Sequence, residues 1–193
     1  MPGLSLPATA ALLVIDVQKA IDHPKWAAAG PRNNPDAEAN IMRLIDYWRK
    51  SGRPLFHIRH DSTSPGSTYL PGLPGNDFKP EALPLAGETV IAKRTNSAFI
   101  GTELERHLRD AGVNTVVVVG VITNNSVEAT VRMGGNLGFD MVLVEDGCFT
   151  FARRDYRGVL RSADEVHAMS LANLDGEYCR VVKTAEIVAA GLF

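Results

Sequence analysis

The sequence has few of the features that mark membrane, secreted or metal-binding proteins. Its two cysteines, Cys148 and Cys179, have no metal-binding spacing, so reduced thiols in a cytoplasmic protein are expected. No apolar run approaches the roughly 18 residues that a membrane span needs. The N-terminal stretch MPGLSLPATA lacks a basic region and a long apolar segment, which argues against a signal peptide.

A strong charge of one sign is also missing. The formal net charge is −2, without a basic block or an acidic tail, which argues against nucleic acid or a membrane surface as a partner. The sequence has no G-x-G-x-x-G motif, no P-loop and no G-x-S-x-G motif, so neither a dinucleotide site nor an α/β-hydrolase triad is indicated. The length suits one globular domain, residues 1–193, and no cofactor is indicated.

Apolar runs alternate with amphipathic segments along the whole chain. Short apolar runs bounded by turn residues are typical of strands buried in a parallel sheet, and they occupy 11–16, 54–60, 89–92, 116–119, 140–145 and 178–182. Helical patterns occupy 36–51, 102–111, about 125–137, 162–175 and 185–190. This alternation predicts an α/β fold with a parallel sheet and right-handed crossovers.

Three polar residues stand just past the ends of predicted strands. These residues are Asp16, Lys93 and Ser126, the last in a predicted first helical turn capped by Thr123 or Asn124. Taken alone, a serine there is more often a helix cap than a nucleophile, and a charge at a strand end is commonly solvated. Ligands of parallel α/β sheets bind beyond the carboxyl ends of the strands, so the convergence of all three predicts a site.

Three stretches together resemble the isochorismatase-like hydrolases of the cysteine hydrolase superfamily. They are VIDVQ around Asp16, KRTNSAFIGTELE from Lys93, and GVITNNSVEATVRMGGNLGF around Ser126. The resemblance extends over nearly the whole chain. It implies a doubly wound, Rossmann-like sheet of six parallel strands in the order 3-2-1-4-5-6, with helices on both faces. Asp16 and Ser126 would then follow adjacent central strands.

The resemblance also implies catalytic roles. In the amidases of the family an Asp, a Lys and a Cys act together, which makes Asp16 the general base and Lys93 the cation that keeps it ionised. The nucleophile falls on residue 126. A cis peptide bond before Ile122 would direct the N–H groups of Ile122 and Ser126 into an oxyanion hole.

Residue 126 departs from the family pattern, because it is Ser and not Cys. A thiol ionises far more readily than an alcohol, which needs a base during its attack. Three interpretations stay open. The protein is an amidase-type hydrolase of small amide- or carbamate-like C–N bonds with a serine nucleophile, a non-covalent hydrolase of a vinyl ether that uses Asp16, or an inactive, natural or engineered, small-molecule-binding relative.

The sequence also leads to expectations about a metal ion, the oligomeric state and the substrate pocket. Nicotinamidases of the superfamily bind a divalent ion through one Asp and two His, but His57 and His60 lie three apart on one strand and point to opposite faces, so no metal is expected. His167 is expected to pack inside the protein or to form a dimer contact.

A homo-oligomer is expected from the apolar residues of the long Pro- and Gly-rich loop 61–88, which are Tyr69, Leu70, Leu73 and Phe78. The candidate substrate-binding residues are Gln18, Trp26, His60, Tyr69 and Phe149.

Overall fold

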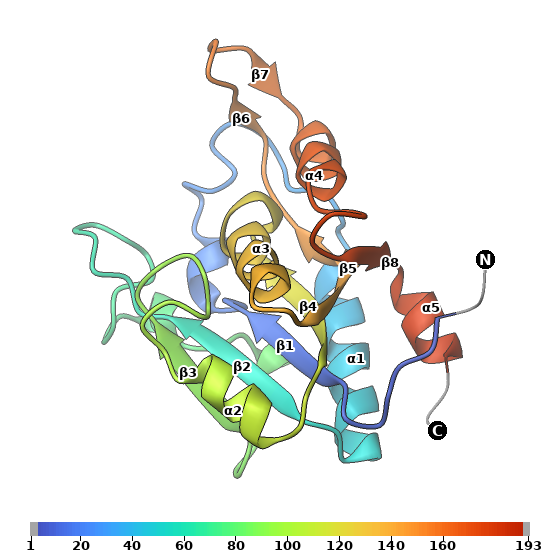
Figure 1. Ribbon diagram of the computed structural model, residues 1–193. Helices are drawn as coiled ribbons and strands as arrows, with labels where there is room; N and C mark the ends of the chain where they lie inside the picture. The colour runs from blue at the N-terminus through green and yellow to red at the C-terminus, as the bar shows by residue number, and fades with distance from the viewer. Residues whose placement is uncertain (1–3, 191–193) are drawn as a thin grey trace.

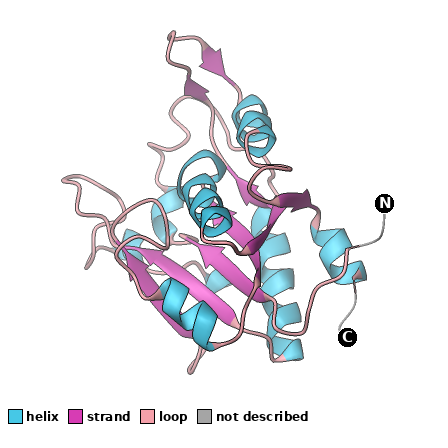
Figure 2. Ribbon diagram, viewed as in Figure 1, coloured by secondary structure: helices cyan, strands magenta, loops and turns pink. Residues whose placement is uncertain are grey.

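The computed structural model describes residues 4–190 and has a central sheet of six parallel strands (Figures 1 and 2). The spatial order is β3-β2-β1-β4-β5-β8. The strands are β1 (Ala11–Ile15), β2 (Leu55–His60), β3 (Thr89–Lys93), β4 (Thr115–Val121), β5 (Asp140–Phe149) and β8 (Arg180–Val182). The predicted doubly wound α/β fold and strand order are confirmed, with β8 as the sixth strand of the sheet.

Helices cover both faces of the sheet. They are α1 (Ala37–Ser51), α2 (Leu104–Asp110), α3 (Glu128–Asn136), α4 (Ala163–Ala172) and α5 (Thr184–Ala189). Helices α2 and α3 pack on one face, in front of the strands in Figure 1, and α1 and α5 pack on the other. The predicted capping box is present, because Ser162 and Glu165 exchange hydrogen bonds at the start of α4. None of the helices within residues 4–190 is long and apolar enough to cross a membrane.

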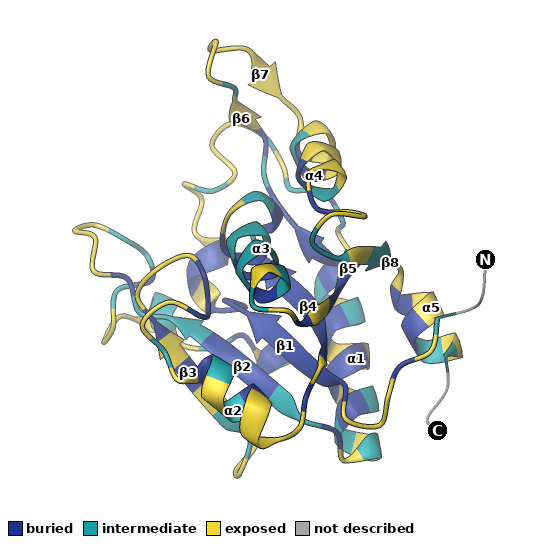
Figure 3. Ribbon diagram, viewed as in Figure 1, coloured by how far each residue is buried: buried dark blue, intermediate teal, exposed yellow. Residues whose placement is uncertain are grey.

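The core lies on both sides of the central strands, which are buried along their whole length (Figure 3). Leu13 packs with Leu104 and Val131 on one face, whereas Leu12 packs with Trp48 on the other. Burial of an aliphatic side chain of this size contributes about 1.5–3 kcal/mol to folding. The unbroken apolar pattern of these strands therefore follows from a sheet that is covered twice.

Two segments differ from the sequence-based expectation. A small antiparallel hairpin, β6 (Arg153–Arg154) with β7 (Leu160–Arg161), projects from the body at the top of Figure 1 and was not predicted. The loop 61–88 folds back on its own chain, where Tyr69 is buried and Leu73 alone of its four apolar candidates is exposed. Three of the four side chains that suggested a homo-oligomer are thus covered by the chain itself, although Leu83 and Leu85 at the end of the same loop are exposed.

Strands β1 and β4 approach each other unusually closely at the carboxyl end of the sheet. Gly120 has a φ angle of 128°, and a Cβ atom there would lie 2.2 Å from the carbonyl oxygen of Ile15. Only glycine fits this approach. It brings the end of β4 against the residue that follows β1, which is Asp16.

Candidate active site

The structure brings Asp16, Lys93 and Ser126 together at the carboxyl end of the sheet. Asp16 follows β1, Lys93 ends β3, and Ser126 lies in the turn η4 (Thr123–Val127) after β4. Lys93 Nζ donates to Asp16 Oδ2 at 2.7 Å and to Ser126 Oγ at 3.2 Å. All three side chains are buried, so these contacts are screened little by solvent. One ammonium group therefore bridges a carboxylate and a hydroxyl.

The backbone holds Asp16 in an uncommon conformation. Its φ angle is 55°, in the left-handed region, where a residue other than glycine costs on the order of 1–3 kcal/mol. Asp16 Oδ1 is buried and has no hydrogen-bond partner within residues 4–190. The Tyr69 hydroxyl donates to the Asp16 carbonyl at 3.4 Å, and burial together with the Asp16 charge raises the pKa of Tyr69 well above its usual value. Asp16 thus keeps one oxygen free to accept a proton.

Ser126 lies in a wide turn, and the predicted helical caps are wrong. Thr123 and Asn124 do not cap a helix; Val127 N donates at 3.4 Å to the carbonyl of Ile122, which closes one π-type turn, and α3 begins at Glu128. Such turns are frequent at functional sites. The peptide bond between Val121 and Ile122 is cis, as the family resemblance implies.

Two further contacts hold the ends of this turn in place. Thr130 Oγ1 donates to the Ser126 carbonyl at 2.7 Å. Thr123 Oγ1 and His167 Nδ1 form a hydrogen bond of 2.8 Å. His167 is buried and packs within the chain. Its position therefore has a structural explanation in the chain itself.

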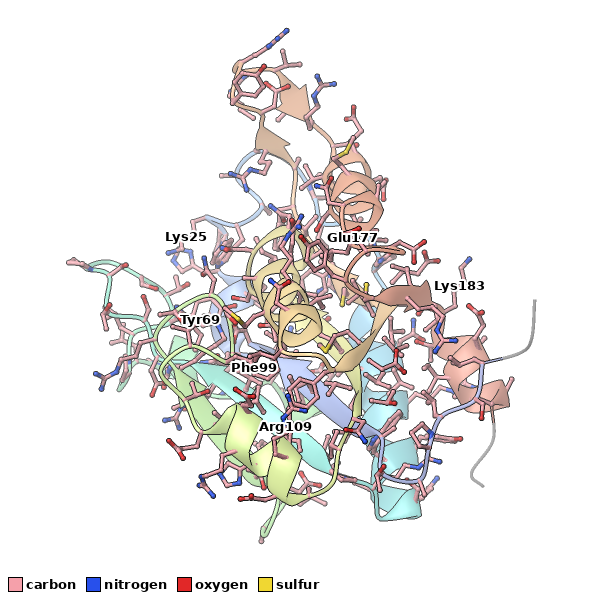
Figure 4. All side chains as sticks on the ribbon, viewed as in Figure 1. Lys25, Tyr69, Phe99, Arg109, Glu177 and Lys183 are labelled. Atoms are coloured by element: carbon pink, nitrogen blue, oxygen red, sulfur yellow. The ribbon has the colours of Figure 1, made fainter. Side chains whose placement is uncertain are left out.

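A cavity of about 340 Å³ opens beside the three residues. Trp26, His60 and Tyr69 line it, and so do Asp16, Ile122 and Ser126. The volume suits a small-molecule substrate. Several polar lining residues were missed by the sequence analysis because their loops have no pattern that reports side-chain direction: Lys25, Ser62, Ser64, Ser67, Asn96 and Asn125. Figure 4 labels Lys25 and Tyr69 on this side of the molecule.

Gln18 and Phe149 do not line the cavity, which corrects two of the candidate positions. The Gln18 side chain is fully buried, and its amide binds the backbone of His60 and of Asn76. Phe149 is also fully buried, in a small apolar cluster with Ile21. Gln18 therefore joins two strand ends, and Phe149 supports the wall behind the site.

His60 is the fourth polar group at the site. It pairs in register with Lys93 on the neighbouring strand, and His60 Nδ1 lies 3.3 Å from Lys93 Nζ. Burial, and next the Lys93 charge, lower the pKa of His60 below its usual value. The Tyr69 ring meets the imidazole edge-on, with 5.6 Å between ring centroids. A neutral imidazole therefore faces a buried ammonium.

The side chains around the site do not form a metal centre. Within residues 4–190, no three His, Cys, Asp or Glu side chains lie together in a way that could hold an ion. Asp61 is bound by the guanidinium of Arg59 at 2.9 Å and 3.0 Å, and His57 binds Glu88 on the other face of β2. Asp61 and His57, the possible metal ligands on either side of His60, are thus already paired within the protein.

A larger cavity lies elsewhere. It measures about 760 Å³ and lies between the β6–β7 hairpin and α4, next to Tyr156 and Met169. None of Asp16, Lys93 or Ser126 lines it. Because catalysis needs convergent chemical groups as well as space, the smaller cavity is the better candidate.

Comparison with known proteins agrees with the fold and the motifs. The isochorismatase domain model matches residues 10–186. A crystal structure of an isochorismatase-family protein from Chromobacterium violaceum is 61% identical, with a TM-score of 0.94 and 98% of each chain covered. The isochorismatase family protein YrdC of Bacillus subtilis is 39% identical over 92% of this chain and 94% of its own length. Nicotinamidase 3 of Arabidopsis thaliana is 30% identical over 86% of this chain and 80% of its own. The chain therefore belongs to the isochorismatase family of hydrolases.

Proposed function

We propose that the protein hydrolyses a C–N bond of a small amide or carbamate, with Ser126 as nucleophile, Asp16 as base and Lys93 as the cation between them. The observation that carries this proposal is the buried ammonium of Lys93, bound to both Asp16 Oδ2 and Ser126 Oγ beside the cavity. The similarity to a nicotinamidase supports an amide as the substrate class.

The proposed reaction has two halves. Ser126 Oγ attacks the carbonyl carbon while its proton passes to the free oxygen of Asp16, and the carbonyl oxygen becomes an oxyanion held by the N–H groups of Ile122 and Ser126. The oxyanion then collapses, the C–N bond breaks, and the amine leaves with the proton from Asp16. Water repeats the sequence on the acyl-serine and releases the acid. Apart from the water, both halves use side chains and N–H groups of this chain.

A non-covalent reaction is the competing function. Hydrolysis of a vinyl ether would need Asp16 to donate a proton to carbon. In the structure Asp16 Oδ2 accepts a hydrogen bond from Lys93, which favours its use as an acceptor. The position of Ser126 beside the same ammonium has no role in that reaction.

The test is a screen of small amides, carbamates and isochorismate with matched variants. We expect amine release by the wild type, and its loss in Asp16→Asn and in Ser126→Ala, while the exposed control Asp110→Asn keeps full activity. Loss with Asp16→Asn but full activity with Ser126→Ala would replace the covalent reaction by the non-covalent one. Equal activity in all the variants would remove the proposed site.

We also propose that the protein is a homo-oligomer. Large exposed apolar side chains gather on the β6–β7 hairpin and α4, with Tyr156 90% and Met169 64% exposed. Exposed charged residues surround these side chains, as is usual for the polar rim of an interface: Arg153, Arg154, Arg157, Arg161, Asp164 and Glu165. A monomer in sedimentation at micromolar concentration would contradict this proposal.

A further inference from the structure

The buried ammonium of Lys93 has more acceptors than protons. Its Nζ lies 2.7 Å from Asp16 Oδ2, 3.1 Å from the Thr95 carbonyl, 3.2 Å from Ser126 Oγ and 3.3 Å from His60 Nδ1. An ammonium group has three N–H bonds. Four acceptors therefore compete for three protons at a buried position.

The competition is between Ser126 and His60. Asp16 carries a charge and makes the shortest contact, and the Thr95 carbonyl is fixed by the backbone. The two remaining acceptors are neutral, and their distances from Nζ differ by only 0.1 Å, between 3.2 Å and 3.3 Å. The third proton of Lys93 is therefore shared between the hydroxyl oxygen and the imidazole.

This arrangement fixes the tautomer of His60. An imidazole nitrogen beside an ammonium must be an acceptor, so the ring proton lies on Nε2. Asp16 and Asp61 also face the ring and oppose the effect of Lys93, but burial and Lys93 prevail and the pKa of His60 is lowered. His60 lines the cavity, and within residues 4–190 no group accepts a hydrogen bond from Nε2. The Nε2–H bond is therefore left for a molecule in the cavity.

We infer that His60 is a positioning residue for Lys93: Nδ1 accepts the third hydrogen bond of Lys93 when Ser126 becomes acylated, and Nε2–H binds an acceptor atom of the substrate. The inference rests on the proposed function for the acylation step. Once Ser126 Oγ has bonded to the carbonyl carbon and its proton has passed to Asp16, the ester oxygen is a poorer acceptor. Lys93 then turns its third N–H to His60 Nδ1, and no buried donor is left without a partner. The substrate must therefore carry an oxygen or nitrogen acceptor near His60.

The first experiment uses no substrate, so it does not depend on the proposed function. In protein labelled with ¹⁵N-histidine, long-range proton–nitrogen spectra report the tautomer of each of the 5 histidines, and the signal that vanishes in His60→Asn identifies His60. We expect a neutral ring with its proton on Nε2 at pH 7. A proton on Nδ1, or an imidazolium ring, would overturn the inference.

Two variants then move the shared proton in opposite directions. Ser126→Ala removes the competing acceptor, so Nδ1 of His60 should become more strongly hydrogen-bonded. Lys93→Met removes the donor, so the same nitrogen should lose its hydrogen bond. The exposed control Lys19→Met should leave the Nδ1 signal of His60 unchanged. An unchanged Nδ1 signal in Ser126→Ala, a variant with no buried charge to disturb the fold, would show that no proton is shared.

Kinetic measurements on any amide that the wild type hydrolyses can separate the roles of Nδ1 and Nε2 of His60. An asparagine at residue 60 places an acceptor near the former Nδ1, whereas a glutamine places a donor near the former Nε2. We expect His60→Asn to keep kcat and raise KM, and His60→Gln to keep KM and lower kcat, each by about tenfold. Equal losses of both parameters in both variants would reduce His60 to packing.

Discussion

Two histidines on one strand illustrate how partners decide what a residue does. His57 and His60 lie three residues apart on β2 and face opposite sides of the sheet. His57 is fully buried and binds Glu88 at 2.9 Å, and Arg49 holds the same carboxylate at 2.7 Å. His60 is half-buried at the cavity and meets an ammonium. The first histidine helps to bind α1 and β2 to Glu88, the residue before β3, whereas the second has a nitrogen, Nε2, that no group within residues 4–190 binds.

The two histidines also differ in the hydrogen bonding of their charged partners, Glu88 and Lys93. Glu88 accepts hydrogen bonds from Arg49, His57 and the Leu85 N–H, so its oxygens are fully engaged. Lys93 instead has a surplus of acceptors, so its hydrogen bonds can be redistributed. Fixed hydrogen bonds on the Glu88 carboxylate suit that cluster to stability, and hydrogen bonds that can be redistributed at Lys93 suit the proposed catalytic role.

The largest effect should follow from removal of the Lys93 ammonium, which lies on the His60 side of β2. We expect Lys93→Met to lower amide hydrolysis by about 10³-fold, because the proposed nucleophile, Ser126, and the proposed base, Asp16, lose the cation between them. It should also lower stability by about 3–5 kcal/mol, since Asp16 is left as an unpaired buried charge. Activity per folded molecule and urea unfolding measure the two losses.

A double variant is the matched control. Asp16→Asn combined with Lys93→Met removes both charges, so stability should return toward the wild type while activity stays lost. If the double variant regained activity, the Asp16–Lys93 ion pair would have only a structural role. The contrast between the His57 side and the His60 side of β2 would then disappear.

A smaller, opposite effect should follow from Ser126→Cys. A thiol ionises more readily than an alcohol, and sulfur is a weaker acceptor, so Lys93 should turn further toward His60. We expect turnover on an activated ester or an amide to rise by about tenfold, and residue 126 to react with iodoacetamide.

The native cysteines make this labelling selective. Burial raises the pKa of Cys148 and raises that of Cys179 to about 12, so both thiols should react slowly. Mass spectrometry of the labelled peptides locates the alkyl group. If Ser126→Cys and Ser126→Ala both leave the native activity unchanged, residue 126 is not the nucleophile.

On the His57 side of β2, removal of the Glu88 charge should affect stability and not activity. The Arg49 guanidinium lowers the pKa of Glu88 from 4.5 to about 2, so the carboxylate stabilises the fold above pH 4.5, and this contribution is lost as the pH falls toward 2. We expect Glu88→Gln to lower the free energy of unfolding at pH 7 by about 1–3 kcal/mol, and to differ less from the wild type near pH 2.

Urea titrations at several pH values measure this difference. Turnover per folded molecule should not change in Glu88→Gln. The exposed control Glu177→Gln should match the wild type in both properties. A loss of turnover with no loss of stability would reverse the roles that we assign to the two faces of β2.

The sequence predicted most of this framework because the framework depends on local pattern. The run Val116 to Val119 and the residues that end the strands are visible in order, and parallel topology carries Asp16, Lys93 and Ser126 to one edge. The hairpin at 153–161 was missed because its polar, arginine-rich sequence lacks an alternating apolar pattern. Tyr69 lines the cavity as expected, but its place among exposed interface residues was wrong, because a Pro- and Gly-rich loop does not report which side chains turn inward.

The surplus of acceptors at Lys93 depends on positions that no local pattern reports. The adjacency of β2 and β3 could have suggested that His60 and Lys93, the last residues of their strands, are neighbours. The distances from one nitrogen to a carbonyl, a hydroxyl and an imidazole depend on rotamers and on the turn η4. Gln18 was assigned to the pocket from its place after β1, but its amide binds backbone groups instead.

The smallest expected effect is that of metal removal. A divalent ion at the site would bind beside the Lys93 ammonium, which contacts both His60 and Asp16 and whose charge would repel a cation. His57 cannot help, since it faces the opposite side of the strand and binds Glu88. Dialysis against EDTA should therefore leave turnover and the unfolding temperature unchanged. Loss of activity on chelation, restored by zinc or manganese in the wild type but not in His60→Asn, would make His60 a metal ligand and end its comparison with His57 as a purely hydrogen-bonded residue.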